Sequence, residues 1–190
     1  MLLRRLSVVT TLLALVGAGI WGLKGYFQIL AAPVVQVGAD APGFMARTLS
    51  GNPVSIDFPG QKTLLVFFKF DCPHCHHELA NIERLAQTYT DAGLRVIGLA
   101  RADNEALRER SFSFPVYIDQ SNAMVGRFGR VTVPTLVMVD ENGVIRYLRS
   151  GANTFETDQQ LVEAFLRGAL ATAGSDGSLA FATEQSRRVQ

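Results

Sequence analysis

Residues 63–75 read TLLVFFKFDCPHC, and this stretch decides the fold. Its first six residues form a continuous apolar run of strand length, which is typical of a strand buried on both faces of a sheet. Two cysteines, Cys72 and Cys75, follow at once. From Glu78 onward apolar residues recur at helical spacing, and Gly93 supplies a C-terminal stop. The sequence therefore predicts a strand, a Cys-x-x-Cys motif and a helix in direct succession.

The segments around this stretch predict an α/β fold with a mixed central sheet flanked by helices. Asp103 is the expected cap of a short helix, and residues 140–143 are expected to form the turn of a β-hairpin. The expected strands are residues 44–49 and 53–56, which pair as an early hairpin, then 63–68, 94–99, 116–119, 131–139 and 144–149, and the expected short and closing helices are 106–110, 123–128 and 161–170. The cysteine motif then lies at the carboxyl end of a central strand, where chemistry usually occurs in open α/β sheets.

The N-terminal region is expected to enter a membrane. Residues 6–23 carry no charge, and this run is long enough to span most of a bilayer core and longer than the usual apolar part of a signal peptide. Proline, at Pro33 and Pro42, directly follows both small-residue sites where a signal peptidase could cut, which favours an uncleaved anchor over a signal peptide. Arg4 and Arg5 precede the apolar run, so the positive-inside rule places the rest of the chain outside the cytoplasm.

These features divide the 190-residue chain into four parts. We expect a membrane anchor or signal peptide at residues 1–30, a linker at 31–41, one globular domain at 42–173 and a flexible tail at 174–190. The predicted location is the inner (cytoplasmic) membrane, crossed once, with the domain facing the periplasm or the cell exterior. Eighteen Lys and Arg against seventeen Asp and Glu leave a formal charge of +1 without basic runs, so no nucleic acid partner is expected.

The two cysteines are the only ones in the chain, so no disulfide framework staples the fold and the pair must react, bind metal or have no chemical role. The start of a helix offers unpaired N–H groups and a partial positive charge, and both favour a thiolate over a thiol. The thiolate is the attacking species in disulfide exchange, and the first cysteine of such motifs is normally the nucleophile. We therefore expect Cys72 to attack and Cys75 to resolve the mixed disulfide.

The two residues between the cysteines have separate expected roles. Pro73 can begin the helix without losing a hydrogen bond, because the first-turn N–H would be unpaired anyway. His74, when protonated, adds a positive charge beside Cys72. Stabilising the reduced form in this way makes the couple more oxidising.

The motif and its surroundings resemble the TlpA/ResA-type branch of thioredoxin-like proteins. The matching residues are 67–75, 133–135 and the turn at 140–143, and the resemblance covers most of residues 42 to about 171. The early hairpin and the extra segment between residues 99 and 131 are similar to that branch as well. The resemblance implies a thioredoxin-like fold with an insertion before the strand that follows a cis-proline.

This resemblance also implies a thiol:disulfide oxidoreductase that needs no cofactor and acts on protein thiols and disulfides, with a membrane redox partner as a further candidate. Pro134 would be the cis-proline that faces the disulfide. Glu78 matches a glutamate that the branch often carries near its active site, and from the residues alone its role is open between a proton relay and an ordinary helix surface.

Some positions depart from the family pattern. Asp71 stands where the family usually has Trp, and Val66 stands where thioredoxin has a buried Asp. The Pro-His dipeptide resembles DsbA, a strong oxidant, whereas proteins of the TlpA/ResA type are mostly reductants. The direction of electron flow is therefore open, and so is the choice among apocytochrome c, other exported proteins and a membrane electron donor as partner.

A copper(I)-binding metallochaperone of thioredoxin fold is the alternative function. Cys72 and Cys75 could bind a soft ion together with one of the three histidines, His74, His76 and His77. All histidines of the chain lie within four positions, however, and there is no second Cys pair to complete a structural zinc site. The redox function is therefore favoured, and no metal or cofactor is expected.

Overall fold

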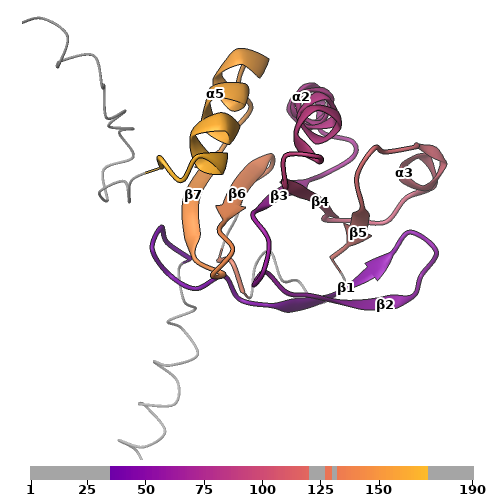
Figure 1. Ribbon diagram of the computed structural model, residues 1–190. Helices are drawn as coiled ribbons and strands as arrows, with labels where there is room; N and C mark the ends of the chain where they lie inside the picture. The colour runs from indigo at the N-terminus through magenta and orange to yellow at the C-terminus, as the bar shows by residue number, and fades with distance from the viewer. Residues whose placement is uncertain (1–34, 120–126, 130–131, 171–190) are drawn as a thin grey trace, which may run out of the picture. The chain divides into compact units, whose positions relative to one another are not determined.

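The structure is a computed structural model, and it describes residues 35–119, 127–129 and 132–170. Contacts divide the chain after Val34, and all described residues belong to the second unit. Its labelled elements are β1 (Phe44–Thr48), β2 (Pro53–Ile56), β3 (Thr63–Phe68), α2 (Pro73–Tyr89), β4 (Arg95–Ala100), α3 (Glu105–Glu109), β5 (Val116–Ile118), β6 (Thr135–Val139), β7 (Ile145–Ser150) and α5 (Phe155–Leu166) (Figure 1).

The strands form one mixed sheet in the order β2-β1-β5-β4-β3-β6-β7. Strand β3 is central, parallel to β4 and antiparallel to β6. The insertion before the cis-proline strand contributes β5, which joins β4 to the N-terminal hairpin. The mixed sheet, the hairpin and the insertion predicted from the sequence are all confirmed.

Both faces of β3 are buried, as its continuous apolar run predicts. Val66 and Phe68 belong to a core cluster with residues of α2 and α5, which lie side by side over one face of the sheet (Figure 1). Phe67 belongs to the cluster on the other face, and its ring centroid lies 5.0 Å from that of Phe128. The strand that precedes the cysteine motif is therefore fixed on both sides.

The ends of the elements follow local chemistry. Helix α2 begins at Pro73, and Gly93, with φ +90°, lies in the turn that leads from the helix into β4. The expected cap of the short helix is wrong by one residue: Asn104, not Asp103, accepts the N–H of Leu107, because Asp103 pairs with Arg108. The closing helix is Phe155–Leu166 and begins six residues earlier than its apolar pattern alone predicts.

Some expected boundaries lie at or beyond the edge of the description. The expected helix at residues 123–128 falls mostly outside the described residues, as do the anchor and the tail. Within the stretch assigned to the linker, Gly38 N–H donates to the Ile145 carbonyl and Ala41 N–H to the Gly143 carbonyl, both at 2.8 Å. Regular contacts with the domain thus extend to Gly38.

Candidate functional site

The two cysteines lie at the N-terminus of α2 with unequal access. Cys72 is the N-cap residue, has extended backbone angles and is partly exposed, whereas Cys75 is completely buried. The Cys72 carbonyl accepts the N–H groups of Cys75 and His76 at 3.0 and 3.1 Å. Both thiols are free. A sulfur atom of another molecule can therefore approach Cys72 but not Cys75.

The environment of Cys75 keeps it a thiol at neutral pH. Burial, and then the hydrogen bond with Cys72, raise the pKa of Cys75 to about 12. A buried thiol of this kind cannot start disulfide exchange, because the thiolate is the attacking species. Its position suits a resolving residue that reacts only after Cys72 has formed a mixed disulfide.

An exposed ion pair precedes the motif. Lys69 Nζ lies 2.7 Å from Asp71 Oδ2, and this hydrogen bond lowers the pKa of Asp71. The negative charge of Asp71 contributes in turn to the raised pKa of Cys75. Asp71 therefore acts electrostatically on the buried thiol.

The side chains between and after the cysteines are mainly solvated. Pro73 is the first helical residue, as expected, and His74 and His77 are exposed. His76 packs edge-on against Phe70, with ring centroids 5.2 Å apart. Within the part of the chain that the structure describes, no three His, Cys, Asp or Glu side chains are placed to hold a metal ion.

The segment before β6 contains the cis peptide bond Val133-Pro134 that the resemblance implies. Pro134 is buried, and its carbonyl accepts the N–H of Gly151 at 2.8 Å. Val133 and Cys72 pack against the same core cluster, the one that contains Cys75.

Glu78 lies one helical turn after Cys75 and is fully buried, so it is not an ordinary surface residue of the helix. Its Oε1 accepts a hydrogen bond from Arg149 Nη2 at 2.7 Å, and its Oε2 accepts one from the N–H of Asn153 at 3.0 Å. The carboxylate is thus held by β7 and by the loop that follows it.

Comparison with known proteins identifies the family. The AhpC/TSA family model matches residues 37–148. The chain belongs to the AhpC/TSA family. It is 28% identical over 160 residues to the thiol-disulfide oxidoreductase ResA of Bacillus thuringiensis subsp. konkukian, covering 80% of this chain and 91% of that protein. It is 23% identical over 150 residues to the sporulation thiol-disulfide oxidoreductase A of Bacillus subtilis, covering 75% and 91%.

Solved structures share the fold of this chain. A thiol:disulfide interchange protein DsbE from Chlorobium tepidum has a TM-score of 0.61 at 21% identity, covering 72% of this chain and 99% of that chain. StoA from Bacillus subtilis has a TM-score of 0.54 at 23% identity, covering 68% and 99%. These likenesses show the thioredoxin-like fold. The family and the curated relatives make the chain a thiol:disulfide oxidoreductase of the ResA/StoA type.

Sequence reasoning missed the partners of Glu78. Arg149 also donates from Nη2 to Asp158 Oδ1 at 3.0 Å, and Asp158 is fully buried. A signal for both was present. Arg149 follows Ile145 and Tyr147 at period two, on the inward side of β7, and Asp158 lies on the helical stripe of Leu161 and Val162.

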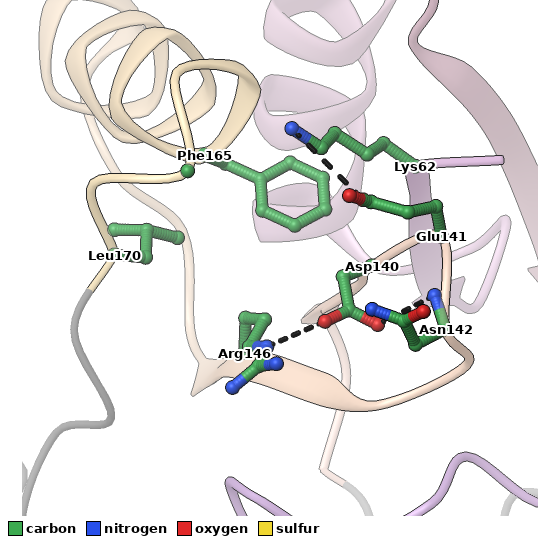
Figure 2. A pocket seen from close by; sticks show the side chains of 8 residues that line it. Lys62, Asp140, Glu141, Asn142, Arg146, Phe165 and Leu170 are labelled. Carbon is green, nitrogen blue, oxygen red and sulfur yellow. Dashed lines mark hydrogen bonds and ion pairs between the residues drawn. The ribbon is translucent and has the colours of Figure 1, made fainter.

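A pocket of about 300 Å³ lies at the other end of the sheet, where β3 begins and β6 ends (Figure 2). Its charged groups are paired with one another: Arg146 Nε lies 2.6 Å from Asp140 Oδ2, and Lys62 Nζ lies 3.9 Å from Glu141 Oε2 (Figure 2). Lys62 also donates to the Leu166 carbonyl at the end of α5. The pocket is therefore explained by contacts that join the turn between β6 and β7 to the end of α5.

His74→Ala is expected to make the disulfide harder to reduce. His74 is exposed beside the N-terminus of α2, and its protonated ring would stabilise a thiolate on Cys72. A lowering of the reduction potential on the order of 30 mV would equal a tenfold change in the equilibrium constant. A glutathione redox titration measures the potential, and His77→Ala is the matched control, since His77 is equally exposed one turn along the helix. An unchanged potential in His74→Ala would show that His74 is a spectator.

Proposed function

We propose that this chain exchanges a Cys72–Cys75 disulfide or dithiol with protein thiols outside the cytoplasm. The observation that carries the proposal is the unequal access of the two sulfur atoms, with Cys72 partly exposed and Cys75 buried beneath it. Exchange through a mixed disulfide needs this arrangement, because one thiol must meet the substrate and the other must wait.

The proposed location rests on the sequence alone. The uncharged run at residues 6–23 and the preceding Arg4 and Arg5 support a single membrane anchor with the domain on the outer side. That run lies outside the described residues, and among the helices that are described none has the length and apolar character to cross a bilayer.

The proposed substrates are exported proteins that contain cysteines, either in cytochrome c maturation or in oxidative folding. The reduction potential of the Cys72–Cys75 couple separates the two. A potential near that of thioredoxin, about −270 mV, favours a reductant that acts in cytochrome c maturation. A potential near that of DsbA, about −120 mV, favours an oxidant that acts in oxidative folding.

The location can be tested on cells that make the full chain. Protease added to spheroplasts should digest the domain, and the mature protein should still begin before residue 6. A cytoplasmic protein of similar size should survive the same treatment, which shows that the membrane is intact. Protection of the domain would contradict the proposed orientation, and a mature N-terminus after Ala32 or Ala41 would contradict the uncleaved anchor.

Copper(I) binding is the alternative function. No observation on the described residues favours it, because the cysteines and histidines of the motif are not gathered into a metal-holding group.

A further inference from the structure

Three charged side chains are buried together behind the cysteine motif, at a place where the fold otherwise has an apolar core. Glu78 and Asp158 are fully buried, and the side chain of Arg149 is only 15% exposed. Arg149 Nη2 reaches both carboxylates, at 2.7 Å to Glu78 and 3.0 Å to Asp158. Taking such groups out of water is costly, and a single guanidinium cannot fully neutralise two carboxylates. Packing alone gives no reason to bury these three charged side chains together, so the cluster is unusual in this domain.

The same arginine is joined to the segment of Pro134. Arg149 Nη1 donates to the Gly151 carbonyl, and the Gly151 N–H donates to the Pro134 carbonyl at 2.8 Å. In the two neighbouring residues, after Pro134 and before Gly151, Thr135 Oγ1 and Ser150 Oγ lie 2.8 Å apart. Gly151, the first residue after β7, is thus bonded to the cis-proline segment through its N–H and to the guanidinium through its carbonyl.

The loop is also joined to the helix of the two cysteines. The N–H of Asn153 donates to Glu78 Oε2 at 3.0 Å, and Asn81 Nδ2 donates to the Asn153 carbonyl at 3.1 Å. Glu78 and Asn81 are one turn apart on α2, the helix that Cys72 caps. A continuous set of hydrogen bonds therefore leads from the cis-proline segment through Arg149 and its loop to the cysteine helix.

We propose that Arg149 is a positioning residue for disulfide exchange, holding the Pro134 segment and the Cys72 helix in the mutual placement that a polypeptide substrate requires. No bond of the reaction is made or broken at Arg149. The proposal rests on the oxidoreductase activity, and it concerns how well a polypeptide is placed against Cys72 rather than the reactivity of the sulfur. Small displacements of such groups are costly, since a misplacement of about 1 Å can reduce a rate about a hundredfold.

Asp158 makes this positioning by Arg149 sensitive to pH. The groups that face it are Glu78 from α2, Arg149 and Tyr147 from β7, and the amide of Asn153. Burial and then the charge of Glu78 raise the pKa of Asp158 to about 6. Among the described residues Asp158 Oδ2 is buried without a hydrogen-bond partner, so no donor stabilises a negative charge on that atom. Above pH 6 the ionised Asp158 competes with Glu78 for Arg149, so that Arg149 holds the Pro134 segment and the Cys72 helix less firmly.

The test compares two disulfide probes with the full-length chain, purified in detergent and reduced. One probe is a pair of fluorescent peptides joined by a disulfide, and the other is the small aromatic disulfide 5,5′-dithiobis(2-nitrobenzoate), which has no polypeptide backbone. Arg149→Lys keeps the positive charge, so the buried carboxylates are not left unpaired, but it loses the planar fork of the guanidinium. With the reduced chain in excess, each probe disulfide is reduced once as one Cys72–Cys75 dithiol is oxidised, so a second-order rate constant is measured. We expect the rate constant for the peptide probe to fall about tenfold and that for the small probe to change less than about twofold. Arg167→Lys, at the exposed C-cap residue of α5, should change neither.

The second arm measures the ratio of the two rate constants, peptide probe over small probe, from pH 5 to pH 7.5. In the wild type the ratio should fall as the pH rises through about 6, and in Asp158→Asn it should stay constant, because an amide does not ionise. Equal losses on both probes in Arg149→Lys, or no loss on either, would overturn the proposal, and so would the same pH dependence in Asp158→Asn as in the wild type. A reduced wild-type chain that reacts with neither probe would instead contradict the exchange activity itself.

Discussion

Replacing Cys72 with serine is expected to abolish disulfide exchange, whereas replacing Cys75 with serine should leave the chain covalently joined to its substrates. Cys72 is the partly exposed sulfur, and a serine hydroxyl in its place is a poor nucleophile, so the rate should fall on the order of a thousandfold or more. Without Cys75, the mixed disulfide at Cys72 lacks the thiol that resolves it.

The adducts can be counted on non-reducing gels after rapid acid quenching of cells that make each variant. The variant with both cysteines replaced is the control for non-covalent association, and reduction should release the trapped proteins from Cys75→Ser. Adducts that accumulate with Cys72→Ser instead would reverse the roles assigned to the two sulfur atoms.

Asp158→Asn is expected to stabilise the domain at neutral pH relative to acid. The pKa of Asp158 is raised from 3.8 to about 6 on folding, so the folded state binds the proton more tightly than the unfolded state. The stability gained from this proton is fully present below pH 3.8 and is lost as the pH rises through 6. Asparagine has no such loss. The difference in the free energy of unfolding, variant minus wild type, should therefore grow by up to about 3 kcal/mol between pH 4 and pH 7.

Urea unfolding of the reduced chain at a series of pH values measures this difference. Asp71→Asn is a control of opposite sign, because the pKa of Asp71 is lowered, chiefly by the hydrogen bond from Lys69. Its stabilising effect is present above pH 3.8 and is lost at lower pH. A difference between Asp158→Asn and the wild type that does not vary with pH would show that Asp158 is not protonated on folding.

The central strand, the cysteine helix and the later hairpin were predictable because each is specified locally. Strand β3 is apolar at every position after Thr63, and proline at position 73 can only begin a helix, not continue one. The hairpin between β6 and β7 depends on its own turn, where Asp140 Oδ1 accepts the N–H groups of Asn142 and Val144. None of these features requires knowledge of a distant partner.

The environment of Glu78 could not be predicted in the same way. Its place on the helix is compatible with exposure, and only contacts with Arg149 and Asn153, more than 70 positions away, show that it is buried. A charged residue on an apolar stripe indicates burial, as for Asp158, but it does not identify the partner. The choice of Asp103 as a helix cap failed for a related reason, since two adjacent residues can both cap and Arg108 had already engaged one of them.

The position of β3 between two late neighbours has a consequence for the order of folding. Its parallel partner is Arg95–Ala100 and its antiparallel partner is Thr135–Val139, so the strand is enclosed only once residue 139 has left the ribosome. Such non-local pairings make folding slow, because a long loop must close before the contacts form. The strand that aims Cys72 at its substrates is therefore completed late, and the two cysteines emerge from synthesis long before the site that uses them exists.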